Sequence, residues 1–360
     1  MALRELELLN FRNYPSLQLE LPTEGALFYG ENGAGKTNLL EAMSVVTLGK
    51  SVRPVSLRDL ITKGKYESFV GASFSDGESL EQQSVGFSKN KQLTISQGGF
   101  QQNSLSSLYK KNRFIYFGPT DIALVTGSRE EKRRALDQII SQKSPHYLQA
   151  LISYRTLVRQ RNALLTALSL DKALLEVYHQ QIAEVAWIIY NERKNFFATI
   201  APSFTSFYQS ISGAEAAITI SYQPSLLVTS QEEYTEKLSQ NCEKDRELGY
   251  TSLGVHRDSF TFKVNGHKFV GYGSQGQMRL VALCFKRCSL IYLEEEYNER
   301  VIVAIDDAFS DLDKGRRTLF FEHILGKAQL FIAVHSKEDI ATYSLPLFTI
   351  EKGIVDASKN

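Results

Sequence analysis

One stretch of the sequence follows the pattern G-x-x-x-x-G-K-[ST], which is typical of a loop that binds nucleotide phosphates: Gly30-Glu31-Asn32-Gly33-Ala34-Gly35-Lys36-Thr37. An apolar run precedes it and a helical pattern follows it. In that context the glycines let successive N–H groups point at phosphates, the Lys36 ammonium reaches the β- and γ-phosphates, and the Thr37 hydroxyl coordinates Mg²⁺. The alternative, a glycine-rich turn before an ordinary helix, is disfavoured by the flanking strand and helix patterns.

A second stretch ends an apolar run in two acids. Residues 301–305 are wholly apolar, as a strand buried in a parallel sheet requires, and Asp306 and Asp307 follow them. Adjacent side chains of a strand point to opposite faces, so we expect two roles. Asp306 holds Mg²⁺ through water, and Asp307 positions or deprotonates the attacking water. An acidic turn after a core strand is the alternative.

A serine and a glycine open a third stretch, over 273–279, at the start of a helical pattern. The Ser274 hydroxyl and the unpaired N–H groups near Gly276 and Gln277 form a site for an anion, or else a simple helix cap. Taken with the phosphate loop and the acidic strand, they are typical of the signature element of ABC-type ATPases. Because Ser274 follows a long insert, we expect it to lie away from Lys36 in one chain. A second chain would then supply the phosphate, which predicts an ATP-dependent homodimer.

His335 follows one more apolar strand, over 330–334, at the sheet edge where nucleotide sites lie. It either holds the γ-phosphate or is structural, and its position leaves both open. Five arginines are candidates for contacts with the phosphate backbone of DNA, although solvated helix faces explain them equally: Arg53, Arg133, Arg134, Arg155 and Arg159.

Composition and periodicity predict two units in the 360 residues. Strand patterns over 3–28, 66–96 and 113–117 predict an α/β head with a mixed sheet and flanking helices, made of residues 1–122 and 298–360. A helical pattern from 129 to about 201 predicts an inserted, mainly helical arm over 123–297, which carries the signature stretch.

Net charge and cysteine usage narrow the class of protein. With 41 Lys and Arg against 40 Asp and Glu, binding to nucleic acid must rest on a local basic patch. Three cysteines without C-x-x-C spacing suit a reducing compartment. The first ten residues do not resemble a signal peptide, and no apolar run is long enough to span a bilayer, so we expect a cytoplasmic protein without a membrane partner.

The sequence resembles the RecF family of bacterial recombination-repair ATPases, which are related to the heads of SMC proteins. The resemblance spans nearly the whole chain. The motifs that carry it are FRNY at 11–14, GENGAGKTNLLE at 30–41, LGKSVR at 48–53, RR-x-x-D at 133–137, GVHRD at 254–258, SQGQ at 274–277 and DDAFSDLD at 306–313.

The resemblance implies an ABC-type P-loop ATPase that binds ATP and Mg²⁺, hydrolyses ATP slowly with stimulation by DNA, and acts in DNA replication, repair and the SOS response to DNA damage. It implies binding to single-stranded, gapped and double-stranded DNA, together with RecO and RecR in loading RecA. It also adds Arg12 and Asn38 to the residues that contact the nucleotide. Two features depart from the family pattern: Val334-His335-Ser336 replaces threonines, and no glutamine loop is apparent over 117–121.

Two other function classes use the same loop. A phosphotransferase has no use for the signature stretch at Ser274. The nucleotide-binding subunit of a transporter usually lacks both a basic helical insert and a separate hairpin at Arg12-Asn13. An ATP-dependent DNA-binding protein is therefore the favoured interpretation, and the transporter subunit is the alternative.

Overall fold

The computed structural model describes residues 1–213, 217–294, 301–309, 313–324, 328–336 and 343–357. The chain divides into two compact units, Met1–Asp121 with Leu293–Asn360 and Ile122–Tyr292. We call the first unit the head and the second the arm, and describe each by itself. The expected end of the insert at 297 lies outside the described residues, as do 310–312 of the acidic motif.

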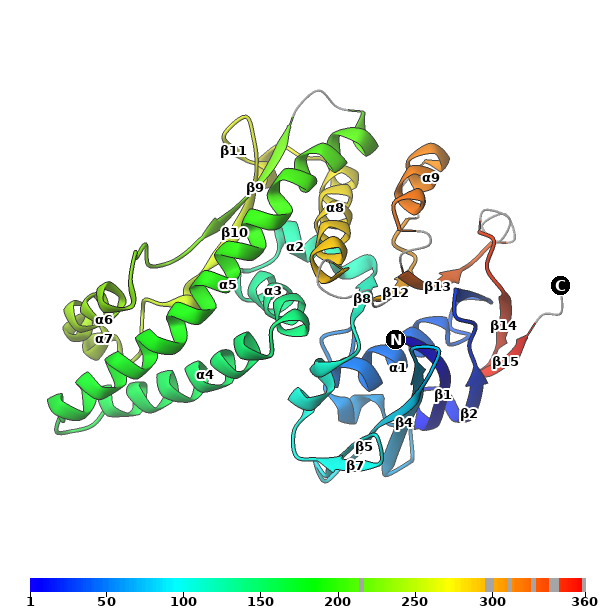
Figure 1. Cartoon of the computed structure of the whole chain (residues 1–360), viewed down its shortest axis with the longest axis horizontal. Coiled ribbons are helices and arrows are strands. Elements are labelled where there is room, and N and C mark those ends of the chain that lie inside the picture. The colour runs from blue at the N-terminus through cyan, green and yellow to red at the C-terminus, as the bar shows by residue number, and fades with distance from the viewer. Residues whose placement is uncertain (214–216, 295–300, 310–312, 325–327, 337–342, 358–360) are drawn as a thin grey trace. The chain divides into compact units, whose positions relative to one another are not determined.

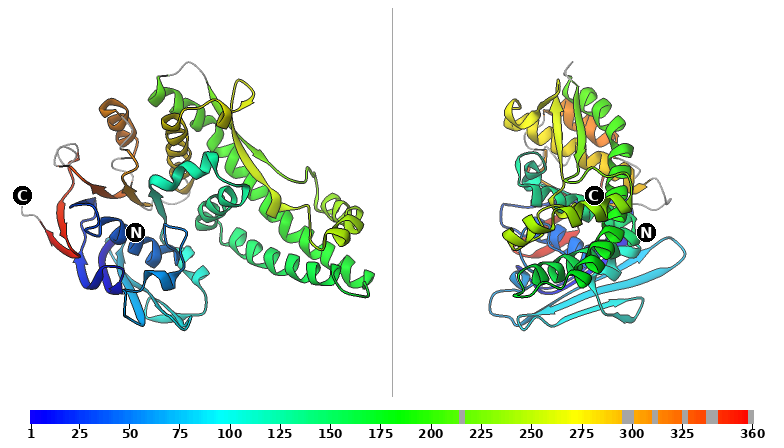
Figure 2. Two further views of the ribbon diagram at one scale, coloured as in Figure 1. Left: turned by 180° about the vertical axis from the view of Figure 1, so that it is seen from behind. Right: turned by 90° about the vertical axis from the view of Figure 1, so that its left-hand side faces the viewer.

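The described part of the head holds two six-stranded sheets (Figure 1). The antiparallel sheet has the order β2-β1-β4-β5-β6-β7, and its long strands β4 and β5 run side by side (Figure 2). The second sheet has the order β15-β14-β3-β13-β12-β8 and is parallel from β14 to β8. The strands are β1 (Ala2–Phe11), β2 (Tyr14–Glu20), β3 (Gly25–Tyr29), β4 (Glu67–Ser75), β5 (Leu80–Ser88), β6 (Leu93–Gln97), β7 (Phe100–Gln102), β8 (Phe114–Phe117), β12 (Val301–Asp306), β13 (Ala328–Val334), β14 (Leu347–Glu351) and β15 (Ile354–Ala357).

Helix α1 (Lys36–Leu48) lies between the two sheets and contacts strands of both. Its side chains are buried all round from Leu39 to its end, which explains why the sequence lacks a polar face there. The helix ends at Gly49, whose left-handed conformation (φ 65°) closes the last turn. The first turn of α1 is thereby fixed at the carboxyl edge of the parallel strands, where the phosphate loop begins. The other described head helix is α9 (Lys314–Glu322), which Asp313 caps through the Arg316 N–H.

The arm is mainly helical and carries a small antiparallel sheet of order β11-β10-β9. Its strands are β9 (Ile218–Gln223), β10 (Ser259–Val264) and β11 (His267–Lys268). Its helices are α2 (Ala123–Thr126), α3 (Arg129–Lys143), α4 (Pro145–Leu165), α5 (Lys172–Ser212), α6 (Gln231–Gln240), α7 (Cys242–Leu248) and α8 (Gln275–Glu294). Aromatic rings pack on strand β10: Phe197 and Phe285 contact Phe260, and Phe204 contacts Phe262.

Helix α5 continues past the expected end near residue 201 and runs through Pro202 to Ser212. An interior proline removes one backbone hydrogen bond and costs about 3 kcal/mol. Phe204, Phe207, Tyr208 and Ile211 are all buried beyond it, so burial of the final turns exceeds the loss. Tertiary packing therefore overrides the local stop signal.

A buried arginine fastens the arm together. Arg193 of α5 is almost inaccessible and lies 2.8 Å from a carboxylate oxygen of Asp137 and of Asp258, and it also donates to the Val255 carbonyl. Because a buried charge must be paired, this one side chain ties α3, α5 and the GVHRD segment into one body.

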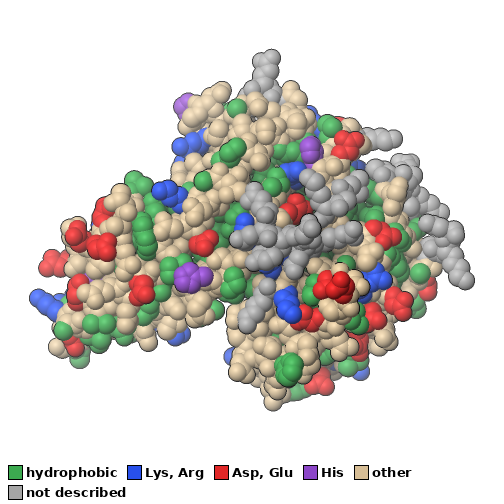
Figure 3. Space-filling model, in the orientation of Figure 1, with side chains coloured by type: hydrophobic (Ala, Val, Ile, Leu, Met, Phe, Trp, Pro, Cys, Tyr) green, Lys and Arg blue, Asp and Glu red, His purple; other side chains and the backbone are tan. Residues whose placement is uncertain are grey.

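The described residues contain no helix that is long and apolar enough to cross a membrane. On the face in Figure 3, Lys and Arg side chains are interspersed with Asp and Glu and do not gather in one basic patch, in keeping with the net charge of +1.

Candidate nucleotide site and signature element

The phosphate loop lies between β3 and α1, with Lys36 as the first residue of the helix. Gly35 has φ 122°, and a Cβ there would lie 2.6 Å from Asn13 Nδ2 and 2.7 Å from the Tyr14 hydroxyl, so only glycine fits. The first turn of α1 has no side-chain cap and no acidic residue. The backbone N–H groups of this turn are therefore suited to an anion.

Lys36 is nearly buried and folds back over the loop. Its Nζ donates to the carbonyl oxygens of Gly30 (2.5 Å) and Glu31 (2.9 Å). Burial lowers the pKa of Lys36, and the nearby Asp306 and Asp307 carboxylates oppose that shift. The structure thus places the lysine and both predicted acids at one location.

Side chains of the turn between β1 and β2 donate hydrogen bonds to the phosphate loop. The Asn13 amide donates to the Ala34 carbonyl (2.9 Å), and the Tyr14 hydroxyl donates to the Gly35 carbonyl (3.0 Å). Arg12 makes a two-point ion pair with the buried Glu41, through Nε (2.8 Å) and Nη2 (3.2 Å). Arg12 is therefore held next to the turn that contacts the loop, and its contact with the nucleotide stays a prediction.

Arg53 belongs to the same network. Its Nη2 donates to Asn38 Oδ1 (2.9 Å), and Asn38 in turn donates to Asn13 (2.8 Å). The Ser51 hydroxyl donates to Glu41, which lies 3.9 Å from Arg53. The cationic turn after α1 is thus folded against the nucleotide site. Glu41 was missed by sequence reasoning, although a carboxylate inside a fully buried helix is a signal that it pairs with cations.

Asp306 is the last residue of β12, and its Oδ2 accepts a hydrogen bond from the Tyr116 hydroxyl of β8 (2.9 Å). Asp307 follows the strand with φ 50° and is exposed. We expected Asp306 and Asp307 to point to opposite faces as neighbours within one strand. That argument is wrong, because the strand ends at Asp306. The two acids still have different surroundings, because Asp306 is buried and Asp307 is exposed.

His335 comes directly after β13, and strand register fixes its neighbours. Val334 pairs with Tyr29, just before the phosphate loop, and Ala333 pairs with Asp306. His335 thus lies at the same sheet edge as Gly30 and Asp307, with its side chain exposed.

The residues fit Mg²⁺ by the chemistry of their donors. The Thr37 hydroxyl and the Asp306 carboxylate are hard oxygen ligands, and Mg²⁺ prefers one or two such groups together with phosphates and water. No cluster of three His, Cys, Asp or Glu side chains that would hold a metal by itself exists among the described residues.

The signature element lies in the arm. Ser274 caps α8: its N–H donates to Gln277 Oε1 (2.8 Å), and its hydroxyl accepts from the Gln277 N–H (3.3 Å). Ser274, Gly276 and Gln277 are all exposed, and a Cβ at Gly276 would meet no atom within 4 Å. This helix end is therefore open to a ligand or a partner chain.

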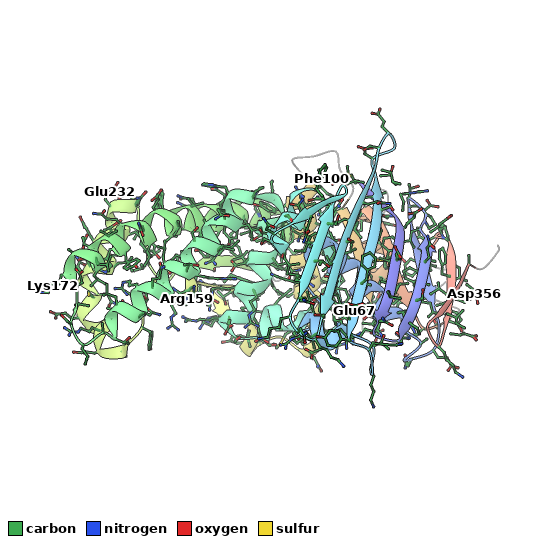
Figure 4. The ribbon with its side chains drawn as sticks, turned by 90° about the horizontal axis from the view of Figure 1, so that it is seen from below. Glu67, Phe100, Arg159, Lys172, Glu232 and Asp356 are labelled. Carbon is green, nitrogen blue, oxygen red and sulfur yellow. The ribbon has the colours of Figure 1, made fainter. Side chains whose placement is uncertain are left out.

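The arm arginines have different surroundings. Arg133 donates to the Asp258 carbonyl (2.7 Å), and the exposed Arg134 pairs with Glu130 one turn earlier. Arg155 and Arg159 line one groove of about 270 Å³, together with Tyr154, Val158, Asn162 and His256. Arg159 projects outward from α4 (Figure 4).

The strand–loop–helix unit, the Asp306-Asp307 pair and the helical insert with an exposed signature end define an ABC-type P-loop ATPase head with an arm. The family model of the RecF/RecN/SMC N terminal domain matches residues 2–350, and the chain belongs to this family.

Relatives within the family are RecF proteins. The chain is 34% identical over 336 residues to the DNA replication and repair protein RecF of Moorella thermoacetica, covering 92% of this chain and 89% of the relative. It is 33% identical over 372 residues to that of Listeria monocytogenes serovar 1/2a, covering 99% and 100%. RecF is therefore the branch of the family to which the chain belongs.

Comparison with solved structures gives the same assignment of fold and family. One described as the recombination mediator protein RecF-ATP in the RecFOR pathway matches with a TM-score of 0.91 at 29% identity, over 99% of this chain and 98% of that one. An SMC head bound to the C-winged helix domain of ScpA matches with a TM-score of 0.56 at 14% identity, which shows the shared fold alone. The predicted fold class and family are both confirmed.

Proposed function

We propose that this protein is an ATP-dependent DNA-binding protein of recombinational repair, which uses slow, DNA-stimulated ATP hydrolysis as a switch. The observation that carries the proposal is strand register, which brings Asp306 to the sheet edge where the phosphate loop with Lys36 begins, in a chain with RecF relatives over its full length. ATP itself is named in the description of the solved relative.

Each residue at the loop has a distinct task in this proposal. The N–H groups from Gly33 to Thr37 hold the β-phosphate, and Lys36 exchanges its bonds to the Gly30 and Glu31 carbonyls for phosphate oxygens. Thr37 and Asp306 hold Mg²⁺, which draws negative charge from the γ-phosphate when bound. Asp307 orients the attacking water and accepts its proton.

In this proposal, Arg12 and Asn38 contact one side of the nucleotide, and the ion pair with Glu41 fixes the Arg12 guanidinium. His335, at the sheet edge beside Gly30, is positioned to contact the γ-phosphate. The Ser274 end of a second chain would contact the same phosphate from the other side. ATP then has a higher affinity for the dimer than for the monomer, and it drives dimerisation by that difference.

We assign DNA backbone contact in the arm to the groove at Arg155 and Arg159. The side chain of Arg155 is 69% exposed, and its 3.9 Å contact with Asp137 is weak in solvent. The double change Arg155→Ala/Arg159→Ala removes two phosphate contacts per chain and lowers the slope of log K against log salt by about two. Lys172→Ala, at the end of the arm, is the matched control (Figure 4).

Partners follow from the RecFOR pathway that the solved relative's description names. We propose that the protein acts in the cytoplasm with RecO and RecR at single-stranded gaps and duplex junctions, and helps to load RecA. The three cysteines are free thiols, which suits a reducing compartment.

Gel shifts on gapped DNA test the proposed function, with and without ATP and with and without Mg²⁺. Affinity should rise with Mg·ATP in the wild type and not in Lys36→Ala. DNA affinity that is indifferent to ATP in the wild type would refute the proposal. The alternative, a transporter subunit, has no support among the relatives, which are DNA repair proteins.

A further inference from the structure

Tyr116 of β8 contacts the predicted metal-binding carboxylate from a neighbouring strand. β8 and β12 are parallel, and Tyr116 pairs with Ala304, two residues before Asp306. Residues two apart in a strand share a face, so Tyr116 and Asp306 are diagonal neighbours on one face of the sheet. The long phenol side chain spans that diagonal, and its hydroxyl donates to Asp306 Oδ2 at 2.9 Å.

The Tyr116 ring lies against Gly118, where the absence of a side chain makes room for it. A Cβ on Gly118 would lie 2.4 Å from Tyr116 Cε1 and 2.5 Å from its hydroxyl oxygen. Any side chain at Gly118 would therefore displace the ring from Asp306. The next turn is also fixed, because the Gly118 N–H donates to the buried Asp121 carboxylate (3.0 Å).

The hydroxyl is a permanent donor. The ordinary pKa of a tyrosine hydroxyl is about 10, so this group keeps its proton at neutral pH. The side chain stays a phenol at any physiological pH, and a carboxylate oxygen has only an acceptor role to offer. The bond is therefore charge-assisted and fixed in direction.

We propose that Tyr116 is a positioning residue of the divalent-metal site, whose hydroxyl holds Asp306 Oδ2 and so fixes the rotation of the carboxylate that would hold the metal. This inference rests on the proposed function. Without the bond, the carboxylate would lose the constraint that fixes its rotation. Hydrogen-bonded partners of a metal ligand contribute about 10- to 100-fold to metal affinity by this kind of orientation.

Tyr116→Phe is the direct test, because it deletes the oxygen and keeps the ring on Gly118. Mn²⁺ replaces Mg²⁺ as the probe, and electron paramagnetic resonance measures its dissociation constant with a non-hydrolysable ATP analogue present. We expect about 10-fold weaker Mn²⁺ binding and little change in nucleotide affinity without metal. Hydrolysis should return to near the wild-type rate at saturating metal, since Tyr116 touches no reacting atom. Tyr66→Phe, an exposed head tyrosine, is the control.

Gly118→Ala tests the same bond from the backbone side. It should also weaken Mn²⁺ binding, and it should add no further loss in a Tyr116→Leu background, because the hydroxyl is already absent there. Additive losses would mean that Gly118 acts independently of Tyr116. Thermal unfolding of each variant identifies any that lose affinity by failing to fold.

The outcomes separate this inference from the proposed function. Failure of the wild-type protein to bind Mn²⁺ with the analogue, or unchanged binding in Asp306→Asn, would overturn the metal site itself. Wild-type binding that Asp306→Asn weakens and Tyr116→Phe leaves unchanged would overturn only the role of Tyr116.

Discussion

Lys36 is held by its own loop in the structure, through the Gly30 and Glu31 carbonyls, and its pKa is lowered mainly by burial. A phosphate would replace those carbonyls as the acceptor of its hydrogen bonds. Lys36→Ala removes the cation, so we expect nucleotide affinity to fall about 10- to 100-fold, in line with loss of a buried charged hydrogen bond.

Lys36→Arg keeps the charge but replaces a compact ammonium with a planar fork, so hydrolysis should fall more than binding. Isothermal titration calorimetry with ATP measures both variants. Equal affinity in the wild type and Lys36→Ala would contradict the assignment of the loop.

The two acids should differ in mutant phenotype, because Asp306 ends β12 under the Tyr116 hydroxyl and Asp307 lies past the strand. Asp306→Asn should weaken the dependence on metal itself. Asp307→Asn should bind Mg·ATP and hydrolyse it about 100-fold or more slowly, because the general base is lost. Single-turnover assays across a Mg²⁺ titration compare them, and the same metal defect in both would show that the roles are not divided.

At the scale of elements, the strands and helix around the loop were predictable because their apolar periods are short and local. Sequence reasoning could not find the Tyr116–Asp306 bond, since the lateral order of β8 and β12 depends on pairing between segments 190 positions apart. The identity of Lys36, Thr37 and Asp306 as candidates came from motif spacing, which encodes chemistry without needing the sheet order.

The arm shows the limit of hydrophobic periodicity. Within the predicted helical stretch, the apolar Leu174 of α5 is 41% exposed, whereas the buried positions include the polar His179 and Arg193. Arg193 enters the core because Asp137 and Asp258 neutralise it, and neither partner is near it in sequence. Pairing of charges across elements is thus invisible to a pattern that counts only apolar residues.

We expect His256 to make the stability of the arm depend on pH. Its Nε2 lies 2.9 Å from the Thr251 carbonyl, which can only accept, so Nδ1 accepts from the Tyr154 hydroxyl at 2.6 Å. Burial lowers the pKa of His256 to about 4, and Arg257 and Arg133 add to the shift. The folded arm therefore contains a neutral imidazole, while the unfolded chain takes up a proton near the ordinary pKa of about 6.5.

This stability is fully present above about pH 6.5 and is lost as pH falls toward about 4, because the unfolded state binds the proton first. The whole shift corresponds to on the order of 3 kcal/mol of unfolding free energy. Denaturant unfolding should be followed from about pH 7.5, above the ordinary pKa of histidine, to about pH 4.5, near the lowered pKa of His256. The free energy of unfolding should fall more steeply over this range in the wild type than in His256→Gln. Parallel curves for the two proteins would contradict the role of His256.

At the scale of the whole molecule, the signature end belongs to the arm and the phosphate loop belongs to the head. Ser274 and Gln277 satisfy one another there, and the surrounding surface is open at Gly276. An exposed helix end of this kind suits a phosphate presented by another chain. In a two-fold dimer, each Ser274 end would meet the ATP held by the partner, so the same contact occurs twice.

Ser274→Arg tests the dimer, because a long cationic side chain there blocks close approach of the partner's loop while Lys36 and Asp306 stay intact. We expect this variant to bind ATP as a monomer, to lose ATP-stimulated DNA binding, and to hydrolyse ATP at a strongly reduced rate. Light scattering with Mg·ATP should find dimers for the wild type and, more stably, for the slow-hydrolysing Asp307→Asn, since hydrolysis would remove the ligand that favours pairing. Ser169→Arg, at an exposed position of the arm between α4 and α5, controls for added charge. Monomers of both the wild type and Asp307→Asn at micromolar concentration, with or without gapped DNA, would refute ATP-driven dimerisation.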